Sequence, residues 1–526
     1  MKKYFTTVLV IEFLIGTFAQ SSLDTKLQNI KTQYQVVGMS VAVVKGDTIA
    51  FSKGYGLRDV GRSLPVNDST VYRIASISKM ISAAALMILY EQGLFNLDDD
   101  VSSYLGFTLR NPTYPNDVIT FRKILSHTSS LRDGTGYDSF LSATYNNTPP
   151  PSLQALLTAG GSYYTSNMFS SSRSPSSNYF EYSNINFGVV GTLVERISNQ
   201  RFDIFCKEKI FQPLGITGSF NIQDIPNINN VSVLYRKSGS TWVPQTDNYL
   251  GVKPPPRNLS GYVIGSNGVI FAPQGGLRCS ANDLSKFMMM IMNGGILNGV
   301  RILNDSTVAR MINPVWIYNG SNGNNYYGIF NTYAVGNHRT VNLLTGETLY
   351  GHPGEAYGLI SDMYFSQIKD YGIIFITNGG VWGNGNYSGW YNIEEDVYKA
   401  CYSQLDSLTV GVDSIEDFSP SGFMLYQNYP NPFNPNTKIS WQSPVSSWQT
   451  LKVYDVLGNE AATLVNEEQS PGTYEVEFSA SGLLASRIQY PASPKEAGSI
   501  GCASGVFFYQ LRAGGYIQTK KMVLLR

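Results

Sequence analysis

Apolar and polar positions divide the chain into two regions with different spacing. Up to about residue 405, apolar residues at helical spacing predict helices over residues 21–36, 80–90, 187–197 and 390–405. Strand-like runs occur near the two ends of this region, over residues 41–59, 358–364 and 371–377. Because both ends supply strands, we expect one sheet that both ends build, flanked by helices, which is an α/β fold.

The second region follows a predicted linker over residues 406–424. Residues 427–437 are rich in Pro and Asn and predict turns. Short strand patterns then occur over residues 451–456, 472–478, 506–512 and 521–525. This change of pattern predicts a separate, smaller domain of β-strands over residues 425–526.

Length and composition narrow the function. The chain has 526 residues, which is too long for one compact domain. Its net charge is zero, which gives no reason to expect a nucleic-acid partner. Its four cysteines fit no zinc-site spacing, so we expect no zinc site built from them. Cys206 and Cys401 fall on apolar helix faces, which is typical of core residues.

Residues 1–19 have the pattern of a signal peptide. Lys2 and Lys3 precede a mostly apolar run over residues 4–18, and Thr17-Phe18-Ala19 fits a cleavage site. A membrane anchor is the alternative, but the run is short and Glu12 interrupts it. We therefore expect export through the periplasm to the medium or the cell surface, with no membrane span after the signal is removed.

Candidate chemistry begins with Ser76 and Lys79, just before the apolar run of residues 80–90. Three-residue spacing puts both side chains on one face of a helix, one turn apart. A lysine can be the base that activates a serine if burial lowers its pKa. Ser366 and Lys369 have the same spacing, but no helix pattern follows them, so we interpret that match as chance.

Tyr182 and Asn184 form the second candidate group. On an extended segment their side chains point the same way, so the phenol can relay a proton while the amide holds a substrate carbonyl or the lysine head. Tyr145 and Tyr426 also begin Tyr-x-Asn triplets, the first in a polar loop and the second in the C-terminal region. Only Tyr182 directly precedes a clear amphipathic helix, so we expect it to carry the chemistry.

The third group is Gly351-His352-Pro353-Gly354, before the strand pattern of residues 357–364. Glycine permits a close approach between backbone and ligand. Pro353 cannot donate to a sheet ladder, which predicts an edge strand that faces a cleft. Such an edge offers free N–H groups for an oxyanion.

In this order the three groups resemble the motifs of the serine β-lactamase and penicillin-binding protein superfamily, most closely its class C-like branch with esterases and D-peptidases. Residues 119–131 and 273–295 are similar to further segments of that family, and the resemblance covers about residues 25–400. It implies a β-lactamase-like serine hydrolase domain over residues 20–405, with an antiparallel sheet flanked by helices and an all-helical region.

The resemblance also implies a mechanism through an acyl-enzyme. Ser76 is the expected nucleophile, Lys79 and Tyr182 share the base role, and Asn184 positions substrate and lysine. No cofactor is needed, and the expected partner is a small-molecule or short peptide substrate.

The third motif implies that His352 and Gly354 contact substrate and that the backbone N–H groups of Ser76 and Glu355 hold the oxyanion. His127, in the segment of residues 119–131, is expected to be a hydrogen-bonded structural histidine.

One departure from the family is His352, where most β-lactamases and DD-peptidases of the superfamily carry lysine. We expect the imidazole to be neutral at pH 7 and connected to solvent, which favours esters, D-amino-acid amides or peptide amides over carboxylate-bearing substrates. A β-lactamase or DD-carboxypeptidase is the alternative. An alternative from outside the enzymes is a non-catalytic protein, either a penicillin-binding sensor or a surface adhesin.

The C-terminal region resembles the sorting domain of the type IX secretion system. The matching residues are Asn428-Tyr429-Pro430-Asn431-Pro432-Phe433-Asn434-Pro435, Tyr454-Asp455-Val456-Leu457-Gly458, Pro471-Gly472-Thr473-Tyr474 and Lys520-Lys521-Met522-Val523-Leu524. The resemblance implies a small β-sandwich over residues 425–526 and the type IX machinery as a partner in export. An insertion over residues 485–503 departs from the pattern and should loop out of the sandwich.

Overall fold

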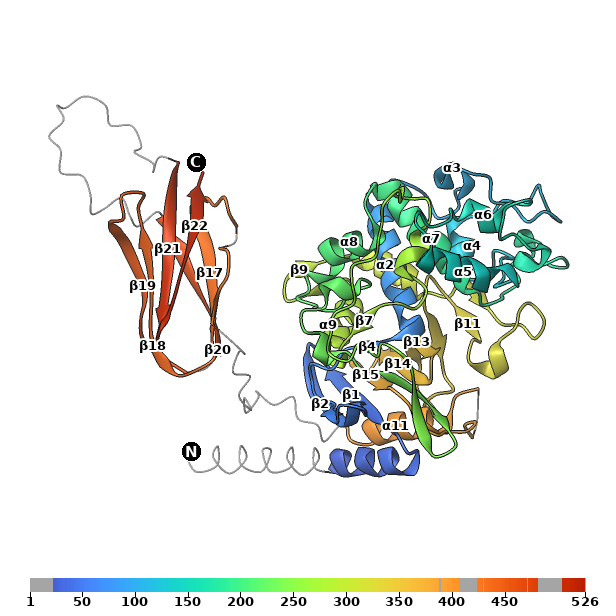
Figure 1. Ribbon diagram of the computed structural model, residues 1–526, viewed down its shortest axis with the longest axis horizontal. Helices are drawn as coiled ribbons and strands as arrows, with labels where there is room; N and C mark the ends of the chain where they lie inside the picture. The colour runs from blue at the N-terminus through green and yellow to red at the C-terminus, as the bar shows by residue number, and fades with distance from the viewer. Residues whose placement is uncertain are drawn as a thin grey trace. The chain divides into compact units, whose positions relative to one another are not determined.

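The computed structural model describes residues 22–386, 389–405, 423–428, 430–470, 472–480 and 504–525. The chain forms two compact units, Met1–Gly411 and Val412–Arg526 (Figure 1). The division falls inside the expected linker. The expected signal peptide, residues 406–422 of the linker and the insertion over residues 485–503 lie outside the described residues.

The first unit is built on a seven-stranded antiparallel sheet with the order β12-β13-β14-β15-β1-β2-β3. The strands are β1 (Gly38–Lys45), β2 (Thr48–Asp59), β3 (Leu64–Pro65), β12 (His338–Thr340), β13 (Leu349–Ala356), β14 (Leu359–Ser366) and β15 (Tyr371–Thr377). Strand β1 pairs with β15, so the first and last strands of the unit are neighbours. This confirms the prediction of one sheet to which both ends contribute.

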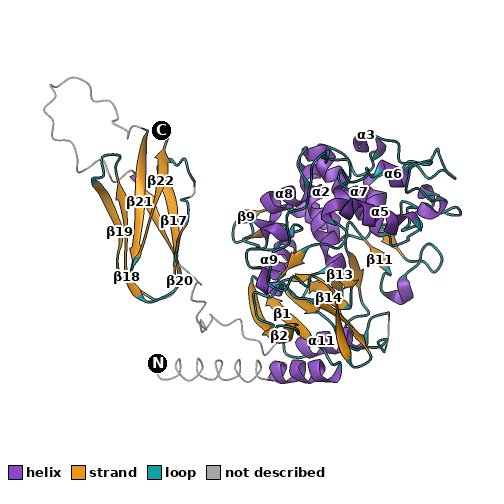
Figure 2. Ribbon diagram, viewed as in Figure 1, coloured by secondary structure: helices purple, strands orange, loops and turns teal. Residues whose placement is uncertain are grey.

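Helices cover both faces of this sheet (Figure 2). On one face, a helix over residues 22–33 and α11 (Asn392–Tyr402) bury Leu23 and Val397 in a shared core. The opposite face carries a larger core that includes α2 (Ser78–Glu91), α7 (Asn184–Ser198) and α9 (Ala281–Met292). The site residues described below lie on or beside this second face.

Shorter elements connect these layers. The remaining helices are α3 (Ser102–Leu105), α4 (Phe121–Leu125), α5 (Gly136–Asn146), α6 (Gln154–Leu157), α8 (Phe202–Cys206) and α10 (Asp305–Ile312). Single turns are η1 (Ala75–Ile77), η2 (Ser166–Met168), η3 (Pro175–Ser177), η4 (Lys207–Phe211), η5 (Ile222–Asp224), η6 (Ile228–Asn230), η7 (Gly268–Phe271) and η8 (Tyr326–Gly328). Two-stranded pairs are β4 (Tyr72–Arg73) with β7 (Arg278–Cys279), β5 (Leu234–Ser238) with β6 (Thr241–Thr246), β8 (Ile296–Leu297) with β9 (Val300–Arg301), and β10 (Trp316–Ile317) with β11 (Thr332–Tyr333).

Helix α2 is the central helix of the first unit. Every residue from Ser78 to Leu89 is buried, as expected for a helix that is apolar on all sides. Its polar exceptions are Ser78, Lys79 and Ser82, and each has hydrogen-bond partners. The only long charged side chain buried in this helix is therefore Lys79.

The second unit consists of two small antiparallel sheets around one apolar core, consistent with a β-sandwich. One sheet has the order β16-β17-β20 and the other β19-β18-β21-β22. The strands are β16 (Met424–Leu425), β17 (Asn436–Ser443), β18 (Ser447–Tyr454), β19 (Glu460–Gln469), β20 (Gly472–Ser479), β21 (Gly505–Ala513) and β22 (Tyr516–Leu524). Four of them overlap the predicted strand patterns, while β16, β17 and β19 were not predicted.

Candidate active site

Ser76 lies in the 3₁₀ turn η1, and α2 follows without a break. The preceding residue, Ala75, has a φ of 48°, a left-handed conformation that costs a non-glycine residue about 1 kcal/mol. Ser76 is thus at the first turn before α2 rather than inside it, and it is partly exposed, whereas Lys79 is fully buried. The Nζ of Lys79 nevertheless lies 2.9 Å from the Oγ of Ser76.

Three oxygen atoms surround the amine of Lys79. Besides Ser76, the Oδ1 of Asn184 accepts a hydrogen bond at 2.9 Å and the backbone carbonyl of Gln274 accepts one at 2.7 Å. Burial lowers the pKa of Lys79 to about 7, and the negative charge of Asp133 opposes this shift. A lysine with such a pKa is partly neutral at physiological pH and can accept a proton from Ser76.

Tyr182 is held between two aromatic rings. Its ring stacks on Phe330 with a centroid distance of 5.2 Å, and the ring of His127 lies 4.4 Å away on a tilted plane. Burial raises the pKa of Tyr182, while a hydrogen bond with Ser76 opposes the increase. The Nζ of Lys79 is 4.9 Å from the ring centroid, so Ser76, Lys79 and Tyr182 are brought together.

Asn184 begins α7, and its orientation is fixed by Asp133. One carboxylate oxygen of Asp133 accepts from both the backbone and the side-chain amide of Asn184 at 2.9 Å, and the other accepts from the N–H of Ile185 at 2.9 Å. The carboxylate thereby satisfies two of the free N–H groups at the helix start. Asp133 was not selected from the sequence, because it begins a long stretch over residues 133–180 that is rich in Ser, Thr, Asn and Pro and is typical of a polar insertion.

Gly354 on β13 packs directly against the turn that carries Ser76. A Cβ at this position would lie 2.7 Å from the carbonyl oxygen of Ile74 and 3.1 Å from the backbone nitrogen of Ser76. Only glycine therefore fits. The next residue, Glu355, has an exposed side chain that accepts from Tyr391 at 3.2 Å, so the part of Glu355 relevant to Ser76 is its backbone.

His352 is fully buried, contrary to the expectation of a solvent-connected imidazole. Its Nδ1 donates to the carbonyl of Pro353 at 2.6 Å, and its Nε2 therefore accepts from the hydroxyl of Tyr333 at 2.9 Å. Burial, with a smaller contribution from the charge of Lys79, lowers the pKa of His352 well below its usual range. The imidazole is neutral as expected, but Tyr333 and Phe330 surround it.

Strand β13 is not the edge of the sheet, which corrects the inference from Pro353. Residues Leu349–Gly351 pair with β12. In the described residues, the pairing between β12 and β13 ends at Gly351. The part of β13 that carries Pro353 and Glu355 therefore pairs only with β14. The proline thus marks the half of the strand whose outer side lacks a sheet partner.

The discarded motif matches have other roles. Ser366 ends β14, while the Nζ of Lys369 pairs with Glu347 at 2.6 Å. Tyr426 belongs to the second unit. Tyr145 does not lie in a polar loop as expected but in the last turn of α5, because the residues before it form a helix with a buried face.

His127 has only part of the hydrogen bonding expected for a structural histidine. Its Nδ1 receives the backbone N–H of Ser183 and pairs with the side-chain amide of Asn186, both at 3.2 Å. Its buried Nε2 has no hydrogen-bond partner among the described residues. Burial lowers the pKa of His127 well below its usual range.

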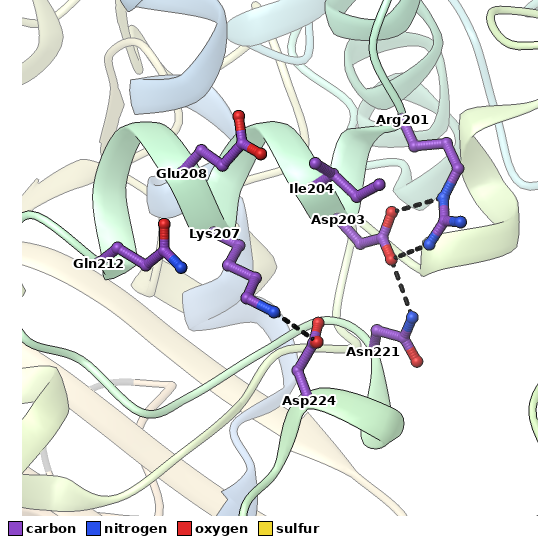
Figure 3. Close-up of a pocket in the computed structure, with 8 residues that line it drawn as sticks. All are labelled: Arg201, Asp203, Ile204, Lys207, Glu208, Gln212, Asn221 and Asp224. Carbon is purple, nitrogen blue, oxygen red and sulfur yellow. Dashed lines mark hydrogen bonds and ion pairs between the residues drawn. The ribbon is translucent and has the colours of Figure 1, made fainter.

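A surface pocket of about 370 Å³ lies apart from these residues (Figure 3). Its lining residues are Arg201, Asp203, Ile204, Lys207, Glu208, Gln212, Asn221 and Asp224. Several of its polar groups pair with one another, including Arg201 with Asp203 and Lys207 with Asp224, as Figure 3 shows. This pocket is therefore a weaker candidate than the Ser76 group.

Two features are absent from the described residues. No group of three or more His, Cys, Asp or Glu side chains there could hold a metal ion. None of the helices in that part of the chain has the length and apolar character that crossing a membrane requires.

Curated relatives match only part of the chain. Protein flp of Staphylococcus aureus strain MRSA252 is 27% identical over 224 residues, which are 42% of each chain. Penicillin-binding protein 4* of Bacillus subtilis is 26% identical over 199 residues, 37% of this chain and 40% of the relative. The chain thus spans less than half the length of the relatives it matches.

Solved structures show the same fold at low identity. The octameric penicillin-binding protein homologue from Pyrococcus abyssi has a TM-score of 0.54 at 18% identity, with 95% of this chain and 99% of that chain covered. EstCE1, a hydrolase with promiscuous acyltransferase activity, has a TM-score of 0.52 at 18% identity, with coverage of 73% and 100%. D-amino acid amidase from Ochrobactrum anthropi SV3 has a TM-score of 0.50 at 20% identity, with coverage of 75% and 98%. The family described as Beta-lactamase matches residues 23–397, and the chain therefore belongs to the β-lactamase family of serine hydrolases.

Proposed function

We propose that this protein hydrolyses esters or D-amino-acid and peptide amides through an acyl-enzyme at Ser76. The observation that carries the proposal is the fully buried Lys79, whose Nζ lies 2.9 Å from the Oγ of Ser76 and whose pKa burial lowers to about 7. Such a lysine is a base positioned on a nucleophile. The sequence order of the three motifs agrees with this assignment.

Acylation begins when neutral Lys79 accepts the proton of Ser76 and the Oγ attacks the substrate carbonyl. The developing oxyanion is held by the backbone N–H groups of Ser76 and Glu355. The close packing of Gly354 against the Ser76 nitrogen supports this pairing, because it brings the backbone of β13 beside η1.

Tyr182 acts as a proton relay. Its pKa is raised by burial, so the phenol is protonated at neutral pH and can donate a proton. It passes a proton to the leaving group and regains one from Lys79, whose Nζ is 4.9 Å from the ring centroid. A water activated by the same pair then hydrolyses the acyl-enzyme.

The neutral His352 and two proteins with this fold support the substrate class. One is a D-amino acid amidase and the other a hydrolase with acyltransferase activity. Penicillins and peptidoglycan stem peptides are the alternative, supported by the similarity to penicillin-binding protein 4* of Bacillus subtilis and to D-alanine carboxypeptidase AmpC of Burkholderia cenocepacia.

A fluorophosphonate label and a substrate panel test the proposal. Wild-type protein should be labelled at Ser76 and should hydrolyse p-nitrophenyl acetate or a D-amino-acid p-nitroanilide with a higher kcat/KM than nitrocefin. Ser76→Ala should abolish label and turnover, a loss of about a thousandfold or more, while Ser366→Ala serves as the matched control.

A higher kcat/KM for nitrocefin than for the ester or the anilide would indicate a β-lactamase instead. Failure to label Ser76 would favour a sensor or adhesin on this fold.

We further propose that residues 1–19 direct export and that residues 425–526 are recognised by the type IX secretion machinery. The motif matches in both segments support this proposal. A chain ending at residue 405 should keep its specific activity but fail to reach the surface of a host that has this machinery. Delivery of the shortened chain to the surface would contradict the role of the tail.

A further inference from the structure

Two arginines lie beside the Ser76 site at the end of strand β13. Arg73 ends β4, three residues before Ser76, and its guanidinium carbon is 5.6 Å from the ring centroid of Tyr357. Tyr357 directly follows β13, and its side chain is 45% exposed. The side chain of Arg73 is 20% exposed, so a small ligand can reach this pair of side chains.

The second arginine approaches from another segment. The guanidinium carbon of Arg257 lies 4.9 Å from the ring centroid of Tyr145. Burial raises the pKa of Tyr145, whereas the charges of Arg73 and Arg257 lower it, so both guanidinium groups act on the same phenol. The side chain of Gln274 also lowers the pKa of Tyr145, and the backbone carbonyl of the same Gln274 accepts from Lys79 at 2.7 Å.

The positive charge at this place is not balanced. Asp247 is the carboxylate of the cluster, and Arg278 already occupies both its oxygens at 3.0 and 2.6 Å. The Nε of Arg73 is 3.8 Å from Asp247 and has no hydrogen-bond partner among the described residues. Arg257 donates to the neutral carbonyl of Ile270 at 2.7 Å. The buried Nε of Arg73 is costly to leave unpaired, and an anionic ligand would pair with it.

The direction of the substrate follows from the place of the proton donor. The leaving group must lie beside Tyr182, whose ring centroid is 6.0 Å from that of His352 on β13. Tyr357 lies five positions further along, roughly 16 Å at about 3.3 Å per residue. Gly354, which contacts the Ser76 turn, lies between them. The acyl part of a bound substrate therefore points toward Arg73 and Tyr357.

We propose that Arg73 and Arg257 form an anion subsite for the acyl part of the substrate, flanked by the exposed rings of Tyr145 and Tyr357. The preferred substrate is an ester or amide whose acyl chain ends in a carboxylate, which a guanidinium binds with paired, charge-assisted hydrogen bonds. This inference rests on the proposed acyl-enzyme at Ser76. It adds that the acyl end of the substrate carries a negative charge, at the opposite end of the site from the neutral His352.

Two p-nitrophenyl esters of equal length test this subsite. The glutarate monoester ends in a carboxylate, and the valerate ester ends in a methyl group at the same position. Wild-type kcat/KM should be about tenfold higher for the glutarate ester, as for a charge-assisted hydrogen bond. The preference should fall with added salt.

Arginine variants locate the effect. Arg257→Gln should bring the ratio of kcat/KM for the two esters close to one, and Arg73→Gln should lower the same ratio. The ratio is used because Arg73→Gln also changes the packing around Asp247, whereas Arg257 is exposed. The exposed Arg301, which bonds only backbone carbonyls of its own hairpin, provides the matched control Arg301→Gln.

The outcomes separate the two proposals. Equal kcat/KM for both esters in the wild type, or an unchanged ratio in Arg257→Gln, would overturn the anion subsite while leaving Ser76 a working nucleophile. Absence of hydrolysis of either ester, together with absence of fluorophosphonate labelling at Ser76, would overturn the proposed function and the subsite with it.

Discussion

The carboxylate of Asp133 holds Asn184 by both its backbone and its side-chain amide, each at 2.9 Å. Because the side-chain nitrogen is engaged, the Oδ1 of Asn184 must point the other way, where it accepts from Lys79 at 2.9 Å. A residue at the edge of a polar insertion thus sets the orientation of an amide in the active site. Its charge also reaches the lysine, since it raises the pKa that burial lowers.

Asp133→Asn should therefore act on both orientation and pKa. The variant keeps one acceptor oxygen but loses the negative charge, so the pKa of Lys79 should fall further and the acidic limb of the kcat/KM profile should move to lower pH. We expect kcat to fall about tenfold because Asn184 is less well held. A lower kcat with an unshifted pH profile would mean that Asp133 acts only through structure.

The wild-type pH profile follows from Lys79. The neutral amine is the active form, and the pKa is lowered from its ordinary value of 10.5 to about 7. Activity should thus be low at pH 5, rise through pH 7 and be level above it, instead of rising until about pH 10. The measurement is kcat/KM for a neutral ester, which reports the free enzyme. A midpoint near pH 10 would show that the pKa of Lys79 is not lowered.

Tyr182→Phe should lower kcat by about a hundredfold or more, because the variant keeps the stacking on Phe330 but removes the relayed proton. Tyr426→Phe, in the second unit, is the matched control. Esters with good leaving groups need less protonation, so p-nitrophenyl esters should lose less activity than amides. An equal loss for both substrate classes would argue against a relay to the leaving group.

The local patterns predicted one sheet built by both ends of the domain and the central helix, while the family resemblance implied that the sheet is antiparallel. The run from Met80 is apolar on every side and is buried, and β1 and β15 pair as their position at both ends of the domain suggests. The motif order also selected Ser76 over Ser366 and Tyr182 over Tyr426. The structure places the selected residues together, within hydrogen-bond or ring-contact distance of Lys79.

The remaining features depend on contacts between distant segments, which no local pattern reports. His352 is buried because the rings of Tyr333 and Phe330, which precede it by about 20 residues, pack against it. Lys79 donates to the backbone carbonyl of Gln274. Every residue has such a carbonyl, so the sequence does not reveal this contact. Tyr145 was assigned to a loop because the polar residues around it hide the buried face of α5.

A buried carboxyl pair on the other face of the sheet gives a prediction for stability. Asp362 on β14 and Glu394 on α11 are both buried and lie close enough to act on each other's pKa. Burial raises the pKa of Asp362 well above its usual range and that of Glu394 from 4.5 to about 8. The folded protein therefore keeps protons that the unfolded chain has already released at neutral pH.

The sign of the effect follows from this difference in bound protons. Below about pH 4.5 both states are protonated and the pair carries no penalty, whereas between about pH 4.5 and 8 the unfolded chain loses protons that the folded protein retains. The free energy of unfolding should thus decrease as pH rises through this window.

Asp362→Asn should flatten this decrease, because an amide in place of the Asp362 carboxyl has no proton that titrates. Denaturant unfolding at pH 5 and pH 9 measures both chains, and the variant should gain stability relative to wild type at pH 9. Asp396→Asn is the matched control, since Asp396 lies on the same helix and accepts from Tyr34 at 2.5 Å in a part-buried position. If the variant and the wild type lose the same free energy between the two pH values, the pair at Asp362 and Glu394 does not cause the decrease.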